Sequence, residues 1–444
     1  MLFLIAFRNL IQARRRTALL GVALGAVTTL FVLLLSLSAG LRETMIRSAT
    51  TLASGHVNIG GFFKARRSNA SPVIGGVAAL RAIVKRELDH VEHVVDRARG
   101  FARIVSPESS MQVGLTGIDV DEEARLLSSI QLAKQSEYLK GGADVVLGNP
   151  QDLALDRGAL IFAAQARRLG VDIGDPLTII AETREGQRNS EEVVVMAIAR
   201  DLGFLSNLSM FVPKSVVRRL YRLGPDVSGV VQIYLDSHQR SAAAMKELRV
   251  HLEAAGHRLL RSDSRPFFAK FSTVAGQAWT GQRLDVTSWQ DEFAFLSWIL
   301  TAVDSTSVAL VSVLLVIIAA GIINSMWISV RERTAEIGTL RAIGMSRGQV
   351  LTLFVLEALM LGALSTGFGA LLGSTLALLI DASHLAVPID AFRAILMSDT
   401  LHLVVKPVDL MTTVAAFSLL TGICALWPAA RAARLAPVKA IHRT

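Results

Sequence analysis

Four long apolar runs, separated by polar segments of very unequal length, dominate the pattern of this chain. The runs cover about residues 17–40, 305–330, 351–380 and 409–429. A helix needs roughly 20 apolar residues to cross about 30 Å of hydrocarbon in a bilayer. Each run meets that length, so the pattern predicts four transmembrane helices with these boundaries.

Residues 41–304, between the first and second apolar runs, have the mixed pattern of a globular domain. The strand-like runs are Val57–Ile59, Val113–Ile118, Leu177–Ala181, Val193–Ala199 and Val230–Leu235. The helix-like runs are 76–95, 158–169, 214–223 and 240–255. The chain is therefore expected to be an α-helical membrane protein with four transmembrane helices and a large α+β domain between the first and second.

Two local features of this domain predict a long helix and a hairpin. Apolar residues recur at helical spacing over 286–304 and continue into the second span. We expect one helix over 286–330, roughly 67 Å long at about 1.5 Å per residue, in which 286–304 is a stalk that carries the domain. The polar stretch 183–189 separates two strand-like runs, so 177–199 is expected to be a hairpin.

The basic residues indicate which segments share a side of the membrane. The chain is 52% hydrophobic and has a net charge of +9. Residues 1–16, 331–347 and 431–443 carry net charges of +4, +2 and +4, so the remainder is close to neutral. Lys and Arg collect in the cytoplasmic segments of membrane proteins, so this distribution argues against nucleic-acid binding.

An even number of spans places both termini on one side, as the charges require. The predicted cytoplasmic parts are 1–16, the connector 331–350 and the tail 430–444. The domain 41–304 and the loop 381–408 are then expected outside the cytoplasm. A cleavable signal peptide is disfavoured because its apolar region usually has about 7–15 residues. Residues 2–13 form either an amphipathic helix on the inner surface or an extension of the first span.

The sequence motifs of common active sites do not occur in this chain. It has no Gly-x-x-x-x-Gly-Lys-Ser/Thr loop, no His-Glu-x-x-His helix and no Gly-x-Ser-x-Gly elbow. Its single cysteine, Cys424, excludes an internal disulfide and a multi-cysteine zinc site. We expect a non-catalytic membrane subunit with no metal and no cofactor of its own.

Small and charged residues inside the apolar runs are candidates for helix packing and coupling. Gly21 and Gly25 lie four apart in the first run, and Gly369 and Gly373 do so in the third. Glycines at this spacing let helix backbones approach closely, so the first span is expected to pack near the second span of its own chain or of a partner. Glu357 is an acid within the third span, for which a structural or coupling role is favoured over a proton relay.

The connector 331–347 is the most informative segment. It is short, charged and helix-favouring, and it lies between two apolar runs. It carries Glu336 and Arg341 on a compact predicted helix. Such a connector suits docking onto a soluble partner that pushes on the membrane part.

The connector resembles the segment after the second span in permeases of the MacB, FtsX and LolC/LolE group of ABC transporters. The matching residues are Arg331, Glu332, Arg333, Glu336, Ile337, Gly338, Leu340, Arg341, Ala342, Gly344 and Met345. The segment 427–441 resembles the group's C-terminal pattern, and Arg8-Asn9-Leu10 resembles its opening. The resemblance therefore covers the spans and both ends of the chain.

The resemblance implies a type VII, mechanotransmitting permease that pairs with a second permease and with an ABC ATPase subunit. ATP and Mg would be bound by that separate ATPase, because the sequence contains no Gly-x-x-x-x-Gly-Lys-Ser/Thr loop. A coupling helix at about 333–345 would dock into the ATPase. The implied coupling residues are Arg333, Glu336, Ile337, Gly338, Leu340, Arg341, Ala342 and Gly344. The implied location is the inner membrane of a Gram-negative bacterium, with 41–304 as a MacB-like periplasmic core domain.

Within the group, the outer domain is most similar to the lipoprotein-releasing LolC/LolE branch. The similar segments are 53–59, 169–175 and 286–290. This branch implies a lipoprotein or lipid cargo and a periplasmic lipoprotein carrier or adaptor, with 181–192 as a candidate carrier-binding hook. Two alternatives stay open: a MacB-like tripartite efflux permease, and an FtsX-like activator of a cell-wall hydrolase.

Overall fold

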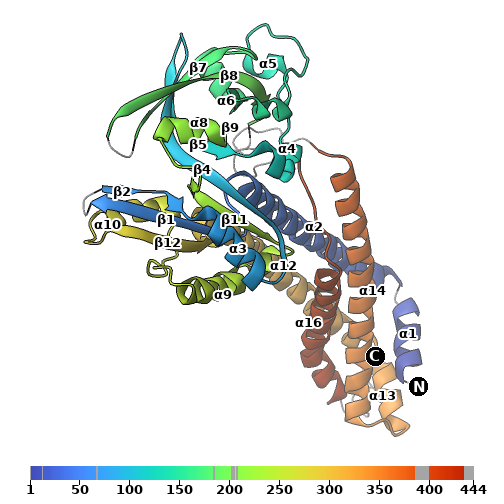
Figure 1. Cartoon of the computed structure of the whole chain (residues 1–444). Helices are drawn as coiled ribbons and strands as arrows, with labels where there is room; N and C mark the ends of the chain where they lie inside the picture. The colour runs from blue at the N-terminus through green and yellow to red at the C-terminus, as the bar shows by residue number, and fades with distance from the viewer. Residues whose placement is uncertain are drawn as a thin grey trace. The chain divides into compact units, whose positions relative to one another are not determined.

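The computed structural model describes residues 2–12, 14–66, 69–183, 186–201, 206, 209–385 and 400–434. The chain forms two compact units (Figure 1). Of the described residues, we call those in 2–43, 299–385 and 400–434 the membrane unit, and those in 44–298 the globular unit.

Four long apolar helices build the membrane unit. The helices of this part are α1 (Leu2–Gln12), α2 (Arg14–Leu52), α12 (Ala294–Glu332), α13 (Thr334–Ala342), α14 (Arg347–Ala382) and α16 (Pro407–Ala433). Those long and apolar enough to cross a membrane are Thr17–Leu52, Ser297–Glu332, Arg347–Ala382 and Pro407–Ala433. The four predicted spans are thus confirmed, and the chain is a multi-pass membrane protein.

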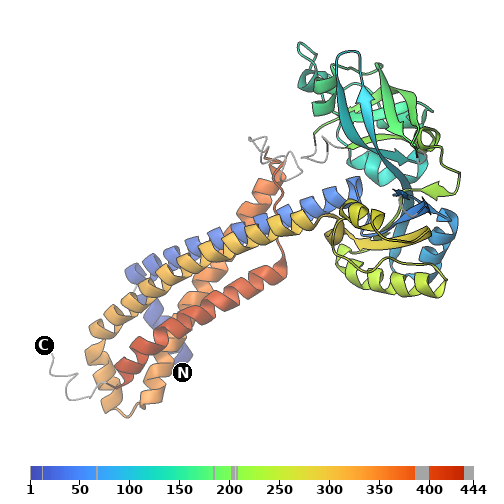
Figure 2. The same ribbon diagram turned by 90° about the vertical axis from the view of Figure 1, so that its left-hand side faces the viewer.

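Small residues allow α14 and α16 to lie side by side, as both Figure 1 and Figure 2 show. A Cβ atom on Gly362 would meet the Thr421 hydroxyl oxygen at 2.1 Å, so only glycine fits there. The same hydroxyl lies 3.2 Å from the Ala358 carbonyl oxygen, to which it can donate. Ser346 starts α14 with a capping box, in which its hydroxyl accepts from the Gln349 amide.

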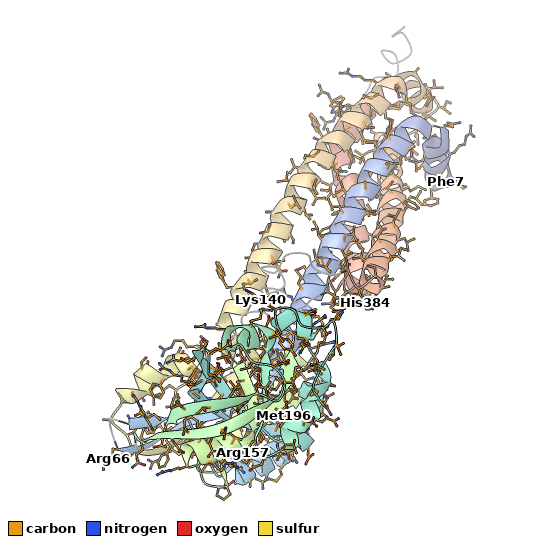
Figure 3. The ribbon with its side chains drawn as sticks, turned by 90° about the horizontal axis from the view of Figure 1, so that it is seen from above. Phe7, Arg66, Lys140, Arg157, Met196 and His384 are labelled. Carbon is orange, nitrogen blue, oxygen red and sulfur yellow. The ribbon has the colours of Figure 1, made fainter. Side chains whose placement is uncertain are left out.

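The N-terminal segment forms helix α1 up to Gln12, and α2 begins at Arg14; residue 13 between them lies outside the described part. On α1, Ala6 and Leu10 are buried, whereas Phe3, Leu4 and Phe7 are exposed (Phe7 is labelled in Figure 3). The exposed side chains are apolar, as expected for a helix whose outer face contacts lipid.

A ten-stranded sheet organises the globular unit, in the order β12-β1-β11-β4-β5-β9-β6-β8-β7 with β2 added to β1. The strands are β1 (Val57–Arg66), β2 (Asn69–Ser71), β3 (Ile74–Gly75), β4 (Val91–Val105), β5 (Ser110–Ile118), β6 (Gly158–Phe162), β7 (Pro176–Glu182), β8 (Arg188–Ala199), β9 (Ser209–Pro213), β10 (Val227–Ser228), β11 (Val230–Leu235) and β12 (Gly281–Ser288). Strands β3 and β10 form a separate pair.

The long strand β4 joins two hydrophobic cores (Figure 1). Its first half pairs with β11, and its second half pairs with β5. The α-helices around the strands are α3 (Val77–Glu87), α4 (Ala124–Ser129), α5 (Gln135–Tyr138), α6 (Ala163–Leu169), α8 (Lys214–Tyr221), α9 (Ser241–Ala254), α10 (Phe271–Ala275) and α11 (Trp289–Glu292). The 3₁₀ turns are Val120–Glu122, Pro150–Ala154, His238–Arg240 and Phe267–Lys270. The α+β prediction is confirmed.

Several predicted elements are confirmed and three are wrong in part. The hairpin 177–199 exists as β7 and β8, with Leu177 opposite Val193; residues 184–185 of its tip lie outside the described part. The expected helix 76–95 ends at Glu87, and β4 begins at Val91. The expected helix 158–169 begins as strand β6. Short apolar runs fit a buried strand as well as a helix, and pairing with distant strands decides between them.

The expected continuous helix 286–330 is also wrong at its start. Residues 286–288 are the end of β12, where Val286 lies opposite Ile59 of β1. The short helix α11 follows, and α12 begins only at Ala294. Pairing with β1 satisfies the backbone of 286–288, which a helix would have to satisfy internally.

A half-buried histidine, His56, should make the stability of the globular unit depend on pH. The Nδ1 atom of His56 accepts from the Leu235 amide at 2.9 Å. Burial, with smaller contributions from the charges of His238 and Arg125, lowers the pKa of His56 to about 4. The unfolded chain protonates this residue near pH 6.5, so stability should fall by up to about 3 kcal/mol as pH falls from 6.5 to 4.

Thermal unfolding of the full chain, followed by tryptophan fluorescence, measures this dependence. His56→Gln should flatten the dependence between pH 6.5 and 4, because glutamine does not titrate. An equal pH dependence in the wild type and the variant would contradict the assignment to His56.

Candidate functional site

The connector between the second and third spans folds as a tight helical turn. Helix α13 begins after Arg333 and ends before Ile343. Gly344 follows with φ 106°, a backbone angle that favours glycine because a Cβ atom is strained there. Ser346 then caps α14. These local signals produce the compact helix that the sequence predicts at this position.

One face of α13 is buried against the membrane unit. Ile337 is 3% exposed and belongs to a core cluster with Val350, Phe354 and Ala429. Gly338 is buried beside it. Both residues were predicted to be coupling residues, and their side of the helix holds α13 in place.

The opposite side, which we call the α13 outer face, comprises Ala335, Glu336, Thr339, Ala342 and Ile343, all of which are exposed. The i, i+4, i+7 and i+8 spacing of 335, 339, 342 and 343 puts these residues on one side of a helix. Ile343 is 79% exposed, which is unusual for a large apolar side chain in a polar connector. The predicted residue Gly344 is exposed next to it, and Leu340 is half-buried.

Arg341 connects α13 to the fourth span by a hydrogen bond. Its Nη1 donates to the Ala433 carbonyl oxygen at 2.9 Å. Ala433 is the last residue of α16, where carbonyl groups have no partner within the helix. The half-buried Arg341 therefore acts first as a cap for α16, which the sequence does not indicate.

Arg333 points into the membrane unit, where it pairs with the predicted intramembrane acid Glu357. Its Nη1 lies 3.3 Å from Oε2 of Glu357, whose side chain is buried. Its Nη2 lies 3.3 Å from the Asn9 carbonyl oxygen and can donate to it. Arg333, which the resemblance implies as a coupling residue, thus links α1 and α14 beneath the connector.

The four glycines predicted to pack helices lie at a close contact between α2 and α14. A Cβ atom on Gly369 would meet the Gly25 carbonyl oxygen at 2.4 Å, and one on Gly373 would meet the Thr29 carbonyl oxygen at 3.0 Å. The Thr29 hydroxyl donates to the Gly369 carbonyl oxygen at 3.0 Å. A Cβ atom on Gly21 would lie 3.0 Å from the Ser365 hydroxyl oxygen. The first span therefore packs on the third span.

The contact expected between the first and second spans involves Asp304, which is not among the predicted site residues. The Ser38 hydroxyl donates to Oδ1 of Asp304 at 2.8 Å, and Arg42 forms an ion pair with the same carboxylate. Asp304 lies in α12, which is otherwise strongly apolar. An isolated acid at the edge of an apolar run is the signal that could have identified it.

Replacing Gly369 with valine should disrupt the membrane unit. The new side chain would meet backbone atoms of Gly25, which cannot move aside as a flexible side chain can. We expect a fall of at least 5 °C in the unfolding midpoint in detergent, from a cost of about 1–3 kcal/mol for overpacking. Gly367→Val is the matched control, because no atom lies within 4 Å of a Cβ atom built there. Equal midpoints for both variants would show that the close contact is incidental.

Among the residues that the structure describes, no group of His, Cys, Asp and Glu side chains could hold a metal ion. The site around α13 consists of an exposed surface and a buried ion pair. Its chemistry suits binding a partner and passing on movement.

Comparisons with known proteins agree with this architecture. Residues 308–437 match the family described as FtsX-like permease C-terminal. The macrolide export ATP-binding/permease protein MacB of Agrobacterium fabrum is 33% identical over 138 residues, which are 31% of this chain and 19% of the relative. MacB of Bartonella quintana is 23% identical over 450 residues, covering 99% of this chain and 59% of the relative.

The chain thus spans less than two thirds of the length of these relatives. A crystal structure of the periplasmic region of MacB from Actinobacillus actinomycetemcomitans aligns with 47% of this chain and 90% of its own, with a TM-score of 0.30 and 13% identity. Taken together, the family match and the sequence relatives support an ABC-type permease of the MacB/FtsX kind, with the FtsX-like permease domain in residues 308–437.

Proposed function

We propose that this chain is the non-catalytic membrane subunit of an ABC system, and that a separate ATPase drives it by binding the α13 outer face. The observation that carries the proposal is the two-sided construction of α13. Its inner side is fixed by Ile337, and its last turn is fixed by the Arg341 contact with Ala433. Its outer side presents Glu336 and the 79% exposed Ile343. A rigid backing and an accessible apolar residue with charged neighbours suit a docking helix.

The orientation of the chain across the membrane follows from this proposal. If α13 faces an ATPase, it lies in the cytoplasm together with both basic termini, and an even number of spans allows this. The globular unit then lies in the periplasm, and the protein lies in the inner membrane of a Gram-negative bacterium. ATP and Mg would be bound by the ATPase.

A second permease, either another copy or a paralogue, is the other proposed partner. Of the four spans, α12 is the least covered by its own chain, with 11% of its most apolar window buried. Its exposed side chains include Val313, Val316 and Ile317. Such a surface contacts either lipid or another helix, and pairing would cover it.

Lipoprotein release is the cargo function we propose first, on the resemblance of three segments to the LolC/LolE branch. In the structure, 53–59 leads from α2 into β1, 169–175 is the turn before β7, and 286–290 joins β12 to α11. These are junctions of the fold, so they support a shared architecture more than a shared cargo. The β7–β8 tip remains the candidate hook for a periplasmic carrier.

Efflux is the second candidate, because the sequence relatives are macrolide export proteins. The third, activation of a cell-wall hydrolase, rests on the FtsX-like match of residues 308–437. All three use the same docking helix and differ only in what the globular unit binds.

Purification of the full chain from native membranes, followed by mass spectrometry of what co-purifies, tests the proposal. An ABC ATPase should be present in every case. Acylated lipoproteins or a lipoprotein carrier would support release, an adaptor with an outer-membrane channel would support efflux, and a hydrolase would support activation. Repeated recovery of the chain with no ATPase would overturn the proposal.

A further inference from the structure

Two helices of the membrane unit end in the same pattern of residues. Helix α12 carries Trp327 and Arg331 four residues apart, and α16 carries Trp427 and Arg431 at the same spacing. Residues four apart lie on one side of a helix, with the second about 6 Å further along the axis. Each arginine lies within two residues of the end of its helix. Both helices therefore present an indole first and a guanidinium just before the helix ends.

Packing brings the two pairs into contact. The rings of Trp327 and Trp427 lie 5.3 Å apart at an interplanar angle of 80°, which is an edge-to-face arrangement. The guanidinium of Arg431 lies over the ring of Trp327, 5.1 Å from its centroid, as in a cation–π contact. Met326 of α12 and Ala429 of α16 belong to one buried apolar cluster, so the backbones of the two helices are also held together here.

These four side chains, which we call the Trp–Arg site, are accessible from outside the membrane unit. Trp427 is 61% exposed. Arg331 and Arg431 are exposed, and Trp327 is partly exposed. A ligand can therefore reach the site without any rearrangement of the helices.

Both guanidiniums have hydrogen-bond donors available. Within the described part of the chain, no oxygen accepts a hydrogen bond from the side chain of Arg331 or Arg431. Stacking on Trp327 uses the face of the Arg431 guanidinium, whereas the N–H donors lie in its plane. Glu332 follows Arg331 in the sequence, so the two arginines still leave the local charge positive. A planar fork of donors on a positive surface matches the oxygens of a phosphate group.

The place of the site along the spans decides which phosphate compounds surround it. Both Ser297–Glu332 and Pro407–Ala433 are long and apolar enough to cross a membrane, and the site lies near the end of each. Tryptophan collects where the hydrocarbon meets the lipid headgroups. Arginine beyond it extends its charged end to the interface. Basic pockets between membrane helices are typical binding places of anionic headgroups.

We infer that the Trp–Arg site binds the headgroup of an anionic phospholipid such as phosphatidylglycerol. The phosphodiester oxygens accept hydrogen bonds from Arg331 and Arg431, and the glycerol backbone of the lipid lies against the two indoles. The inference concerns the membrane unit alone and needs no ATPase, so it goes beyond the proposed function and can fail or succeed independently of it. The helix dipole also favours arginine at the C-terminal end of a helix, but it gives no preference for one lipid over another.

Native mass spectrometry of the full chain tests the inference. The chain is purified in a mild detergent and mixed with equal amounts of phosphatidylglycerol and phosphatidylcholine that carry the same acyl chains. The wild type should retain phosphatidylglycerol at least about tenfold more than phosphatidylcholine, because each arginine near an anionic headgroup adds affinity. Equal retention of the two lipids by the wild type would overturn the inference.

Two single variants separate a site from a general attraction of charge. Arg431→Gln should lower the preference for phosphatidylglycerol at least about threefold. Arg347→Gln is the matched control, because it removes the same charge from an exposed arginine at the start of α14, and it should leave the preference unchanged. Both side chains are exposed, so both variants should unfold at the midpoint of the wild type. Equal losses of preference in the two variants would refute the site.

Competition with inorganic phosphate separates a lipid from a free anion. Inorganic phosphate has no glycerol backbone to contact the indoles, so an excess of it should leave phosphatidylglycerol bound. Displacement of the lipid by inorganic phosphate would contradict the assignment of a lipid headgroup.

Tryptophan quenching tests the site in a bilayer. The full chain is reconstituted in phosphatidylcholine bilayers that contain a small share of either brominated phosphatidylglycerol or brominated phosphatidylcholine. The difference in emission between the wild type and Trp427→Phe isolates Trp427, which should be quenched more by the brominated phosphatidylglycerol. This excess should vanish when Arg331→Gln and Arg431→Gln are combined. Absence of quenching of Trp427 by either lipid would show that a protein chain, such as a second copy, covers the site, and would overturn the inference.

Discussion

Arg333→Met should destabilise the membrane unit by about 3 kcal/mol or more, because removing one member of a buried ion pair leaves the other charge in an apolar environment. Glu357 is 5% exposed, and its Oε2 lies 3.3 Å from the Arg333 guanidinium. The variant also loses the contact between Arg333 and the Asn9 carbonyl oxygen, which ties α1 to the connector. The midpoint of unfolding in a denaturing-detergent titration of the full chain measures the loss.

A double-mutant cycle separates the ion pair from the other contacts of Arg333. Glu357→Gln removes the charge but keeps the shape, so it should cost less than Arg333→Met. The double variant Arg333→Met with Glu357→Gln should be more stable than Arg333→Met alone, since the buried negative charge that Arg333 balances is then gone as well. Independent, additive losses would contradict a direct pair between these side chains.

Ile343→Asp should abolish stable binding of the ATPase. Burying an isoleucine side chain contributes about 1.5–3 kcal/mol, and a charge in its place adds a desolvation cost. We therefore expect affinity to fall by at least about 30-fold. Ile343 is exposed on the α13 outer face and lies outside the core cluster beneath the connector. The fold should therefore survive, and the unfolding midpoint should not move.

The conservative variant Ile343→Leu is the matched control, because it keeps the apolar area. Binding of the purified ATPase to the chain in nanodiscs, measured for wild type and both variants, gives the comparison. Retention of wild-type affinity in Ile343→Asp would place the docking surface elsewhere.

The four spans could be predicted because length and apolar content are enough to identify a membrane helix. The start of α12 could not. Val286, Trp289 and Phe293 recur at helical spacing, but the pairing of Val286 with Ile59 makes 286–288 a strand. The predicted helix 76–95 overlaps strand β4 for the same reason. The first half of β4 pairs with β11, which lies far away in sequence, and no local pattern contains that pairing.

The candidate site, too, could be predicted from the sequence only in part. The sequence predicts a compact, charged helix at 334–342, yet it cannot tell that Arg333 faces inward while Glu336 faces outward. That difference depends on Glu357, which packing brings beneath the connector. Likewise, the spacing of Gly25 and Gly369 predicts close approach but not which helix approaches which. The buried Arg97 of β4, which pairs with Glu123 and donates to the Leu52 carbonyl oxygen, has no local signal, because an arginine in a strand is usually exposed.

Photo-crosslinking tests the proposed binding of an ATPase to α13. A photoreactive amino acid replaces Ile343 in one strain and Leu310, an exposed position in α12, in another. Both strains express the full chain with its neighbouring ATPase in native membranes. The account predicts a crosslink to the ATPase from position 343 and none from position 310. No crosslink from position 343 in cells where the ATPase co-purifies with the chain would contradict it.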